Sequence, residues 1–171
     1  MFTIHTVQKL FLASLTEMLT ESQSTGFRAV QRLLDEWETG THRFDRPGEA
    51  RFVATINRQT IGICGLTIDP YTDQLDCGRV RRLYVMMEHR CNGIGHALVE
   101  RVIAEARLSF TQLHVRTDHP ITDRLYRSIS IAGLSPLFRS AASHPSIITA
   151  IARLITPSIY ALLYRCLCLC V

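Results

Sequence analysis

The sequence predicts a mixed α/β fold in which helices flank one central, largely antiparallel sheet. The first observation is size and composition: 171 residues, 47% hydrophobic and 20% charged, are typical of one ordinary globular domain. The second is the order of predicted elements, β-α-α-β-β-β-α-β-α. This order alternates too little for a doubly wound parallel sheet, and it favours a single mixed sheet with helices packed on it.

The N-terminal part is predicted to form a short strand and two helices. Residues 2–6 form the strand. Apolar residues then recur at helical spacing over 7–19 and again over 27–37, which predicts two amphipathic helices. Residues 42–50 include Pro47 and Gly48 and are predicted to form a loop.

The middle of the chain is predicted to form three strands. Two β-rich runs, residues 51–57 and 61–68, are separated by the polar link Arg58-Gln59-Thr60, which predicts an antiparallel hairpin. Residues 69–73 are rich in turn-forming types. The third run, over 79–86, is rich in Val, Leu and Tyr and is predicted to be the next strand.

A helix, a strand and a second helix follow. Residues 94–108 carry an apolar stripe at 94, 98, 102 and 106, which predicts an amphipathic helix. Residues 110–117 alternate between apolar and polar types, as a half-buried strand does. Pro120 suits the first turn of a helix, and residues 122–129 continue it.

The charge distribution divides the chain. The formal net charge is +4 and no basic run exceeds Arg81-Arg82, so we expect no nucleic-acid partner. Every acidic residue lies at or before Asp123. We therefore predict one domain over 1–130 and an atypical, apolar C-terminal segment over 131–171 that is not a separate domain. A shifted reading frame and a lineage-specific tail would each explain so abrupt a change.

Cysteine usage and the N-terminus favour a cytoplasmic protein. No secretory signal is visible, so reduced thiols are expected. The C-x-C-x-C tail at 166–170 has no His or acid beside it, and no metal site is predicted. Residues 147–164 approach the length of a membrane span, but Arg153 would lie in the hydrocarbon. A membrane partner is therefore not expected.

The most informative stretch joins the third strand of the middle part to the long helix. Gly93 and Gly95 allow a sharp turn and the close approach of a ligand to the main chain. The N–H groups at a helix N-terminus form an anion site, and Arg90 adds a permanent cation. The stretch suits a phosphate, but Leu98 breaks a dinucleotide fingerprint and His96 breaks a Walker loop.

The pattern R-x-x-G-x-G, formed by Arg90, Gly93 and Gly95 directly after a strand, resembles the acetyl-CoA signature of the GNAT superfamily of N-acetyltransferases. The flanking runs 81–85 and 125–128 agree with that resemblance, which covers about residues 52–128. Beyond Ser128 the chain has Ile-Ser-Ile where relatives often have Leu-Gly-Phe. The resemblance implies a sheet splayed between the strands 79–86 and 110–117, with acetyl-CoA in the gap.

The resemblance also implies which residues hold acetyl-CoA, the acetyl donor. The backbone of Leu83, Tyr84 and Val85 would pair with the pantetheine arm, as an added strand would. Arg90 would lie near the pyrophosphate. The amine acceptor would approach from the opposite side, beneath the first two helices. The N–H groups that would hold the pyrophosphate belong to Cys91, Asn92, Gly93, Ile94, Gly95 and His96.

The implied reaction is direct transfer of acetyl to a primary amine of a small molecule or a protein. Tyr126 matches the position where many relatives keep a tyrosine that protonates the CoA thiolate; the alternative is a tyrosine packed on the core. Many relatives place a Glu near the start of the strand that enters the signature, where this chain has arginines. The candidate base is Glu88. The further candidates are Asp76, His114, His119 and a water chain.

Two functional hypotheses follow. One is an active acetyl-CoA-dependent N-acetyltransferase. The other is a catalytically impaired, CoA-binding relative with an altered C-terminus. Three acids of the second helix, Asp35, Glu36 and Glu38, would suit a cationic acceptor, but such acids more often form a solvated face. The acceptor and the oligomeric state, including a homodimer, stay open.

Overall fold

The structure is a computed structural model, and it describes residues 1–8, 12–117, 120–131, 136–137 and 148–153. Most of the segment 131–171 therefore lies outside the described residues. The same holds for His119, for the cysteine tail and for the greater part of the apolar stretch 147–164.

One sheet runs through the described part of the molecule in the order β1-β2-β3-β4-β5-β7-β6. Neighbouring strands are antiparallel, except that β4 and β5 are parallel. The predicted fold class is confirmed. The strands are β1 (Thr3–Thr6), β2 (Ala50–Ile56), β3 (Gln59–Ile68), β4 (Cys77–Val85), β5 (Gln112–Thr117), β6 (Pro136–Leu137) and β7 (Ile148–Arg153).

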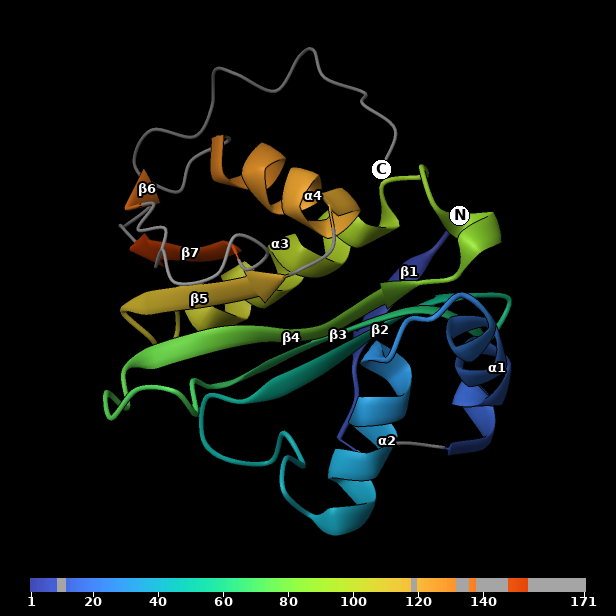
Figure 1. Ribbon diagram of the computed structural model, residues 1–171, viewed down its shortest axis with the longest axis horizontal. Helices are drawn as coiled ribbons and strands as arrows, with labels where there is room; N and C mark the ends of the chain where they lie inside the picture. The colour runs from blue at the N-terminus through green and yellow to red at the C-terminus, as the bar shows by residue number, and fades with distance from the viewer. Residues whose placement is uncertain (9–11, 118–119, 132–135, 138–147, 154–171) are drawn as a thin grey trace.

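Helices cover both faces of the sheet. Figure 1 shows α3 and α4 on one face and α1 and α2 on the other. Two single-turn 3-10 helices, η1 and η2, precede α1 and follow β4. The helices are η1 (Leu12–Leu15), α1 (Thr16–Ser24), α2 (Ala29–Thr39), η2 (Met87–His89), α3 (Ile94–Ala106) and α4 (Pro120–Ile131).

Each face of the sheet has its own hydrophobic cluster. The larger cluster lies under α3 and α4 and includes Phe52, Leu66 and Leu113. The apolar stripe that predicted α3 is buried in it, because residues 94, 98, 102 and 106 all face the sheet. The smaller cluster, under α1 and α2, joins helix residues such as Met18 to strand residues such as Ile63.

The helix predicted over 7–19 is wrong in its position. The Val7 N–H donates to the Arg51 carbonyl at 2.9 Å, so Val7 continues the pairing of β1 with β2 instead of starting a helix. Among the described residues the helical turns begin at Leu12, and α1 runs to Ser24. Apolar spacing alone did not detect this added strand pairing, because the pairing partner is 44 residues away in the chain.

The predicted hairpin is present, but its turn is shorter than predicted. Ile56 pairs directly with Gln59, so the turn consists of Asn57 and Arg58 and not of Arg58-Gln59-Thr60. Both turn residues have positive φ, 48° and 69°. Two positive φ values identify the tight turn whose twist matches the flanking strands. Asn adopts this conformation readily, whereas Arg adopts it at a cost.

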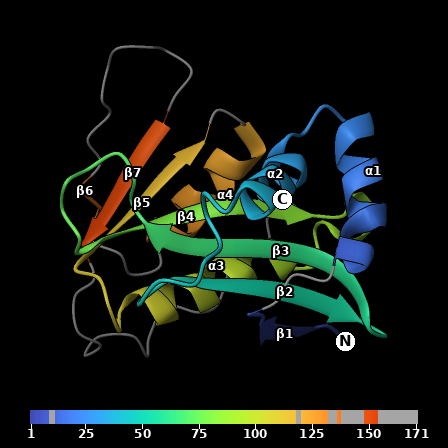
Figure 2. The same ribbon diagram turned by 90° about the horizontal axis from the view of Figure 1, so that it is seen from below.

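The sheet opens between its two parallel strands. Residues 77–79 of β4 pair with 112–114 of β5, and beyond these three pairs the strands diverge, as Figure 2 shows. On its other side β5 pairs with β7 along all six residues, 112–117. The gap is thus bordered by β4 beyond Arg79 on one side and by β5 beyond His114 on the other.

A β-bulge interrupts β4 where it borders this gap. Gly65 of β3 lies opposite Arg81, and Ile63 lies opposite Tyr84, so that Arg82 and Leu83 together face the single residue Cys64. Arg82 has a φ of 57°. An extra residue reverses the alternation of side chains. Consecutive residues Arg81 and Arg82 therefore point to the same face of the sheet, toward α2.

Candidate active site

The turn between β4 and α3 presents main-chain N–H groups beside the gap. After η2 the backbone is extended at Arg90, positive in φ at Cys91 (61°) and at Gly93 (75°), and helical from Ile94. The N-cap residue of α3 is Gly93, which has no side chain to cap the helix. The first N–H groups of a helix have no partner within it, and together with the helix dipole they favour an anion.

The two glycines of the turn serve different purposes. A Cβ at Gly93 would meet no atom within 4 Å, so glycine is needed there for its positive φ and not for space. A Cβ at Gly95 would lie 3.3 Å from Leu125 Cδ2 and 3.8 Å from Val85 Cγ2. Gly95 thus lets the start of α3 pack closely against α4 and the end of β4.

Arg90 and Asn92 hold this turn against the strand. The Arg90 Nε donates to the Val85 carbonyl at 2.9 Å, and its guanidinium lies 5.5 Å from the ring centres of both Phe27 and Tyr84. The Asn92 Nδ2 donates to the carbonyls of His89 and Arg90. Sequence reasoning placed Arg90 beside phosphate; its observed contacts also make it a support for the turn.

Glu21 of α1 is a supporting residue that the sequence did not reveal. Its Oε1 accepts hydrogen bonds from the Tyr84 hydroxyl at 2.7 Å and from the Met87 N–H at 3.0 Å. Burial and the hydrogen bond to Glu21 raise the pKa of Tyr84 to about 12. One carboxylate thus joins α1 to the end of β4 and to the start of the turn. Glu21 and Tyr84 are 63 positions apart in the chain, and only the fold brings them together.

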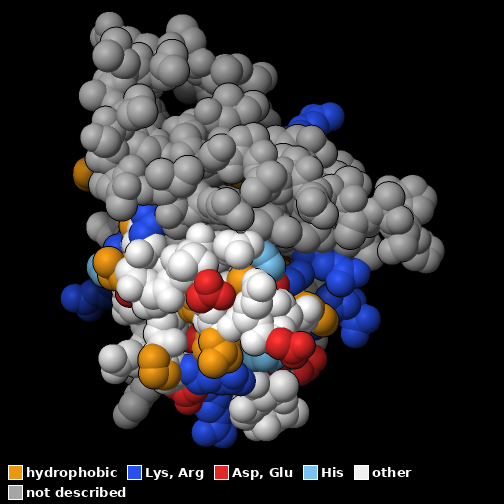
Figure 3. All heavy atoms as spheres, turned by 90° about the vertical axis from the view of Figure 1, so that its left-hand side faces the viewer, with side chains coloured by type: hydrophobic (Ala, Val, Ile, Leu, Met, Phe, Trp, Pro, Cys, Tyr) orange, Lys and Arg blue, Asp and Glu red, His pale blue; other side chains and the backbone are white. Residues whose placement is uncertain are grey.

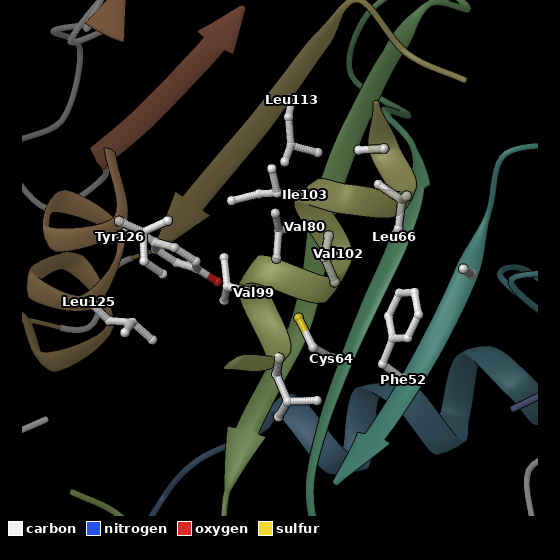
Figure 4. Packing of buried hydrophobic residues seen from close by; sticks show 14 of the residues in the cluster. Phe52, Cys64, Leu66, Val80, Val99, Val102, Ile103, Leu113, Leu125 and Tyr126 are labelled. Atoms are coloured by element: carbon white, nitrogen blue, oxygen red, sulfur yellow. The ribbon is translucent and has the colours of Figure 1, made fainter. Parts of the chain in front are cut away.

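Tyr126 lies in α4 with its ring in the larger hydrophobic cluster. The residue is 9% exposed, and Figure 4 shows its hydroxyl directed toward Val99 of α3. Burial raises the pKa of Tyr126 well above 10, so the hydroxyl keeps its proton at neutral pH. The packing fits a core tyrosine, and burial makes the hydroxyl a weaker acid than an exposed tyrosine.

Two of the candidate bases lie at the surface. Glu88 in η2 has 64% of its side-chain surface exposed, and its Oε1 lies 3.1 Å from the His89 Nε2. Asp76 is exposed, and its Oδ2 accepts from the Thr111 hydroxyl at 2.5 Å. Neither carboxylate has the buried setting that shifts a group toward acid–base work. His119 lies outside the described residues.

The chain matches a model of the acetyltransferase (GNAT) family over residues 12–129. The chain belongs to the GNAT family. The resemblance inferred from Arg90, Gly93 and Gly95 is therefore confirmed, and the splayed sheet agrees with it. No curated protein sequence matches this chain.

Solved structures agree with this GNAT assignment. An assigned acetyltransferase from Exiguobacterium sp. 255-15 is 27% identical, with a TM-score of 0.73 over 90% of this chain and 93% of that chain. An assigned GNAT acetyltransferase from Desulfovibrio desulfuricans is 20% identical, with a TM-score of 0.65 over 91% and 100%. A third, from Salmonella typhimurium and bound to its cofactor acetyl-CoA, is 16% identical, with a TM-score of 0.65 over 92% and 96%.

In this GNAT protein two of the three arginines of β4 bind an acid of α2. The Glu36 carboxylate accepts from Arg81 Nη2 at 2.8 Å and from Arg82 Nε at 3.0 Å, and it also contacts Arg82 Nη2. All three side chains are mostly buried. The expectation of a solvated acidic face is therefore wrong for Glu36, because the bulge in β4 directs both arginines toward it.

A second buried charge cluster lies where β4 and β5 separate. Asp69, at the end of β3, is 2% exposed and accepts from Arg79 Nη1 at 2.8 and 3.0 Å. Its Oδ2 lies 2.5 Å from the His114 Nδ1. Figure 3 shows the end of the molecule where the loop 69–76 lies. Acidic, basic and histidine side chains lie close together on this surface. Burial opposes ionisation of Asp69, but hydrogen bonds from His114, Tyr71 N–H and Arg79 lower its pKa below 3.8.

This lowered pKa predicts how acid affects stability. Asp69 stabilises the fold while ionised, and this contribution is complete above the unfolded-state pKa and lost as pH falls through the lower, folded-state pKa. We expect D69N to lose less stability than the wild type between pH 6 and pH 2.5, measured by urea unfolding at each pH. D73N, in the exposed part of the same loop, is the control. Equal pH dependence in D69N and the wild type would contradict this assignment.

A further prediction concerns Cys91, an exposed free thiol with positive φ. A non-glycine residue in this conformation is strained, and glycine relieves the strain at some cost in chain entropy. We expect C91G to raise the free energy of unfolding by about 0.5 to 1 kcal/mol. C91S, which keeps the Cβ, should leave it unchanged. Equal stabilities for C91G and C91S in urea titrations would show that the turn does not require positive φ there.

No group of three or more His, Cys, Asp or Glu side chains in the described part of the chain is placed to hold a metal ion. No helix within it combines the length and apolar character needed to cross a membrane.

Proposed function

We propose that the protein is an acetyl-CoA-dependent N-acetyltransferase that moves acetyl to a primary amine of a small molecule or a protein. One observation carries the proposal: the anion-binding turn 91–96 opens directly beside the gap between β4 and β5. A ligand with a pyrophosphate at one end and an extended, amide-containing arm fits this combination. The acetyl-CoA-bound Salmonella structure, which shares the fold, supports it.

The proposed binding mode uses main-chain groups for most contacts. The N–H groups of residues 91–96 would hold the pyrophosphate, because the helix dipole and the positive-φ turn direct them outward. The pantetheine amides would pair with Leu83–Val85, since β4 has no β5 neighbour there. Arg90 would contribute charge while its hydrogen bond to the Val85 carbonyl keeps the turn in place.

The proposed chemistry is direct attack. The thioester supplies an activated acetyl group and the neutral amine attacks its carbonyl carbon. The C–S bond breaks to release the CoA thiolate, and the nitrogen loses one proton to solvent as the amide forms. Tyr126, which matches the position of the family's tyrosine acid, would protonate that thiolate. Glu88 stays a candidate base; its carboxylate is exposed and lies beside His89.

Turnover and binding together test the proposal. We expect acetyl-CoA to bind, to raise the melting temperature, and to release CoA thiol when members of an amine panel are added. Binding without turnover on any amine would favour the catalytically impaired relative. Absence of binding would overturn both hypotheses.

A further inference from the structure

His114 occupies the closed end of the gap, on the face where an acceptor amine would approach. It is the last residue of β5 that pairs with β4, opposite Arg79. Its neighbours Leu113 and Val115 pack into the cluster under α3 and α4. Since side chains alternate along a strand, His114 points to the opposite face, the one that α1 and α2 cover.

The two nitrogens of His114 have different surroundings. Nδ1 is bonded to the buried Asp69 carboxylate, which in turn binds Arg79. Nε2 is buried and has no hydrogen-bond partner in the described part of the chain. Because the ionised Asp69 accepts the Nδ1 proton, Nε2 of the neutral ring is left as an acceptor.

The same row of the sheet holds a second unpaired polar atom. Thr67 of β3 pairs with Arg79 from the other side, and its buried hydroxyl also lacks a partner among the described residues. Unpaired buried polar atoms are unfavourable and are few in native proteins. A ligand with N–H groups would satisfy Nε2. Nε2 itself is buried, but 13% of the His114 side chain is exposed, so the ring lies at the border of the gap and not deep in the core.

We propose that His114, oriented by Asp69, is the base that accepts the proton of the acceptor amine. This inference rests on the proposed function. An N–H bond of the ammonium group breaks, its proton moves to Nε2, and the freed electron pair attacks the acetyl carbonyl carbon. The C–S bond then breaks, the CoA thiolate leaves and takes a proton from Tyr126, and the nitrogen loses its second proton to solvent as the amide forms. Asp69 is a positioning residue that stabilises the resulting imidazolium, as the carboxylate of a His–Asp pair does.

The charges around His114 come from several elements. Asp69 and Asp76 lie in or beside the loop after β3, Arg79 and Arg81 project from the same face of β4, and Arg116 follows on the same face of β5. In the register of the sheet, His114 pairs with Ile151 of β7. Asp69 is the carboxylate in contact with the ring, so the proton would be received beside a negative charge that Arg79 holds in place.

H114N is the matched test, because the asparagine amide can still donate to Asp69 while Nε2 is lost. With an aliphatic amine at pH 7, we expect kcat/KM to fall about 100-fold and acetyl-CoA affinity to be unchanged. The loss should shrink as pH rises toward the amine pKa, and it should be small for an aromatic amine that is unprotonated at pH 7. H5N, at an exposed histidine of β1, should behave as the wild type.

The outcomes separate this inference from the proposed function. A wild type that acetylates no amine removes the proposed function. A wild type that turns over, with H114N matching H5N in rate and pH profile, overturns the role of His114 alone. If H114N fails to fold, the pH profile of the wild type tests the role of His114 instead. The pH profile of kcat/KM is measured with amines of different pKa. A midpoint of the acidic limb that is the same for all amines supports an enzyme base. A midpoint that changes with the pKa of each amine overturns the role of His114.

Discussion

Replacing Glu36 with glutamine is expected to lower the free energy of unfolding by about 3 kcal/mol. The carboxylate is the shared acceptor of Arg81 and Arg82, whose side chains are only 9% and 15% exposed. Removing its charge leaves two neighbouring cations without their common partner in a poorly solvated place. Breaking a buried ion pair from one side is costly for this reason.

The matched control for this prediction is E38Q. Glu38 is two residues further along α2 and exposed, so its neutralisation should change stability little. Urea unfolding at neutral pH compares the two variants. Since the same arginines flank the bulge in β4, E36Q should also raise the KM for acetyl-CoA. Equal stabilities of E36Q and E38Q would show that Glu36 does not hold the bulge.

The second large effect is expected in kcat. Y126F removes one oxygen atom and keeps the ring that packs against α3. If Tyr126 protonates the thiolate, kcat should fall about 100-fold while the KM for acetyl-CoA changes little. Y71F, at an exposed tyrosine of the loop 69–76, is the control. An unchanged kcat in Y126F would establish the alternative, a tyrosine that only packs.

The parts of the site that the sequence predicted are local in the chain. Arg90, Gly93 and Gly95 fall within six residues, between a strand and a helix that both have clear periodicity. The turn therefore forms from its own residues, and its position could be assigned in advance. The same applies to α3, whose apolar stripe identifies its buried face.

The parts that it missed depend on strand register. Alternation along an undisturbed strand would send Arg81 and Arg82 to opposite faces, and no local pattern announces the bulge that sends them to the same face. Asp69 and His114 are 45 positions apart and meet only because β4 and β5 pair at Arg79. The one available sign was chemical: arginines in a buried strand require acids nearby.

A sheet that opens in its middle has two more edges than a closed one. Beyond Arg79, β4 pairs with β3 on one side only among the described strands, and such an edge is a template for association with a strand of another molecule. Charged side chains discourage that association, and Arg81, Arg82 and Arg116 flank the opening. An extended ligand seated there would protect the molecule from self-association as well as from unfolding.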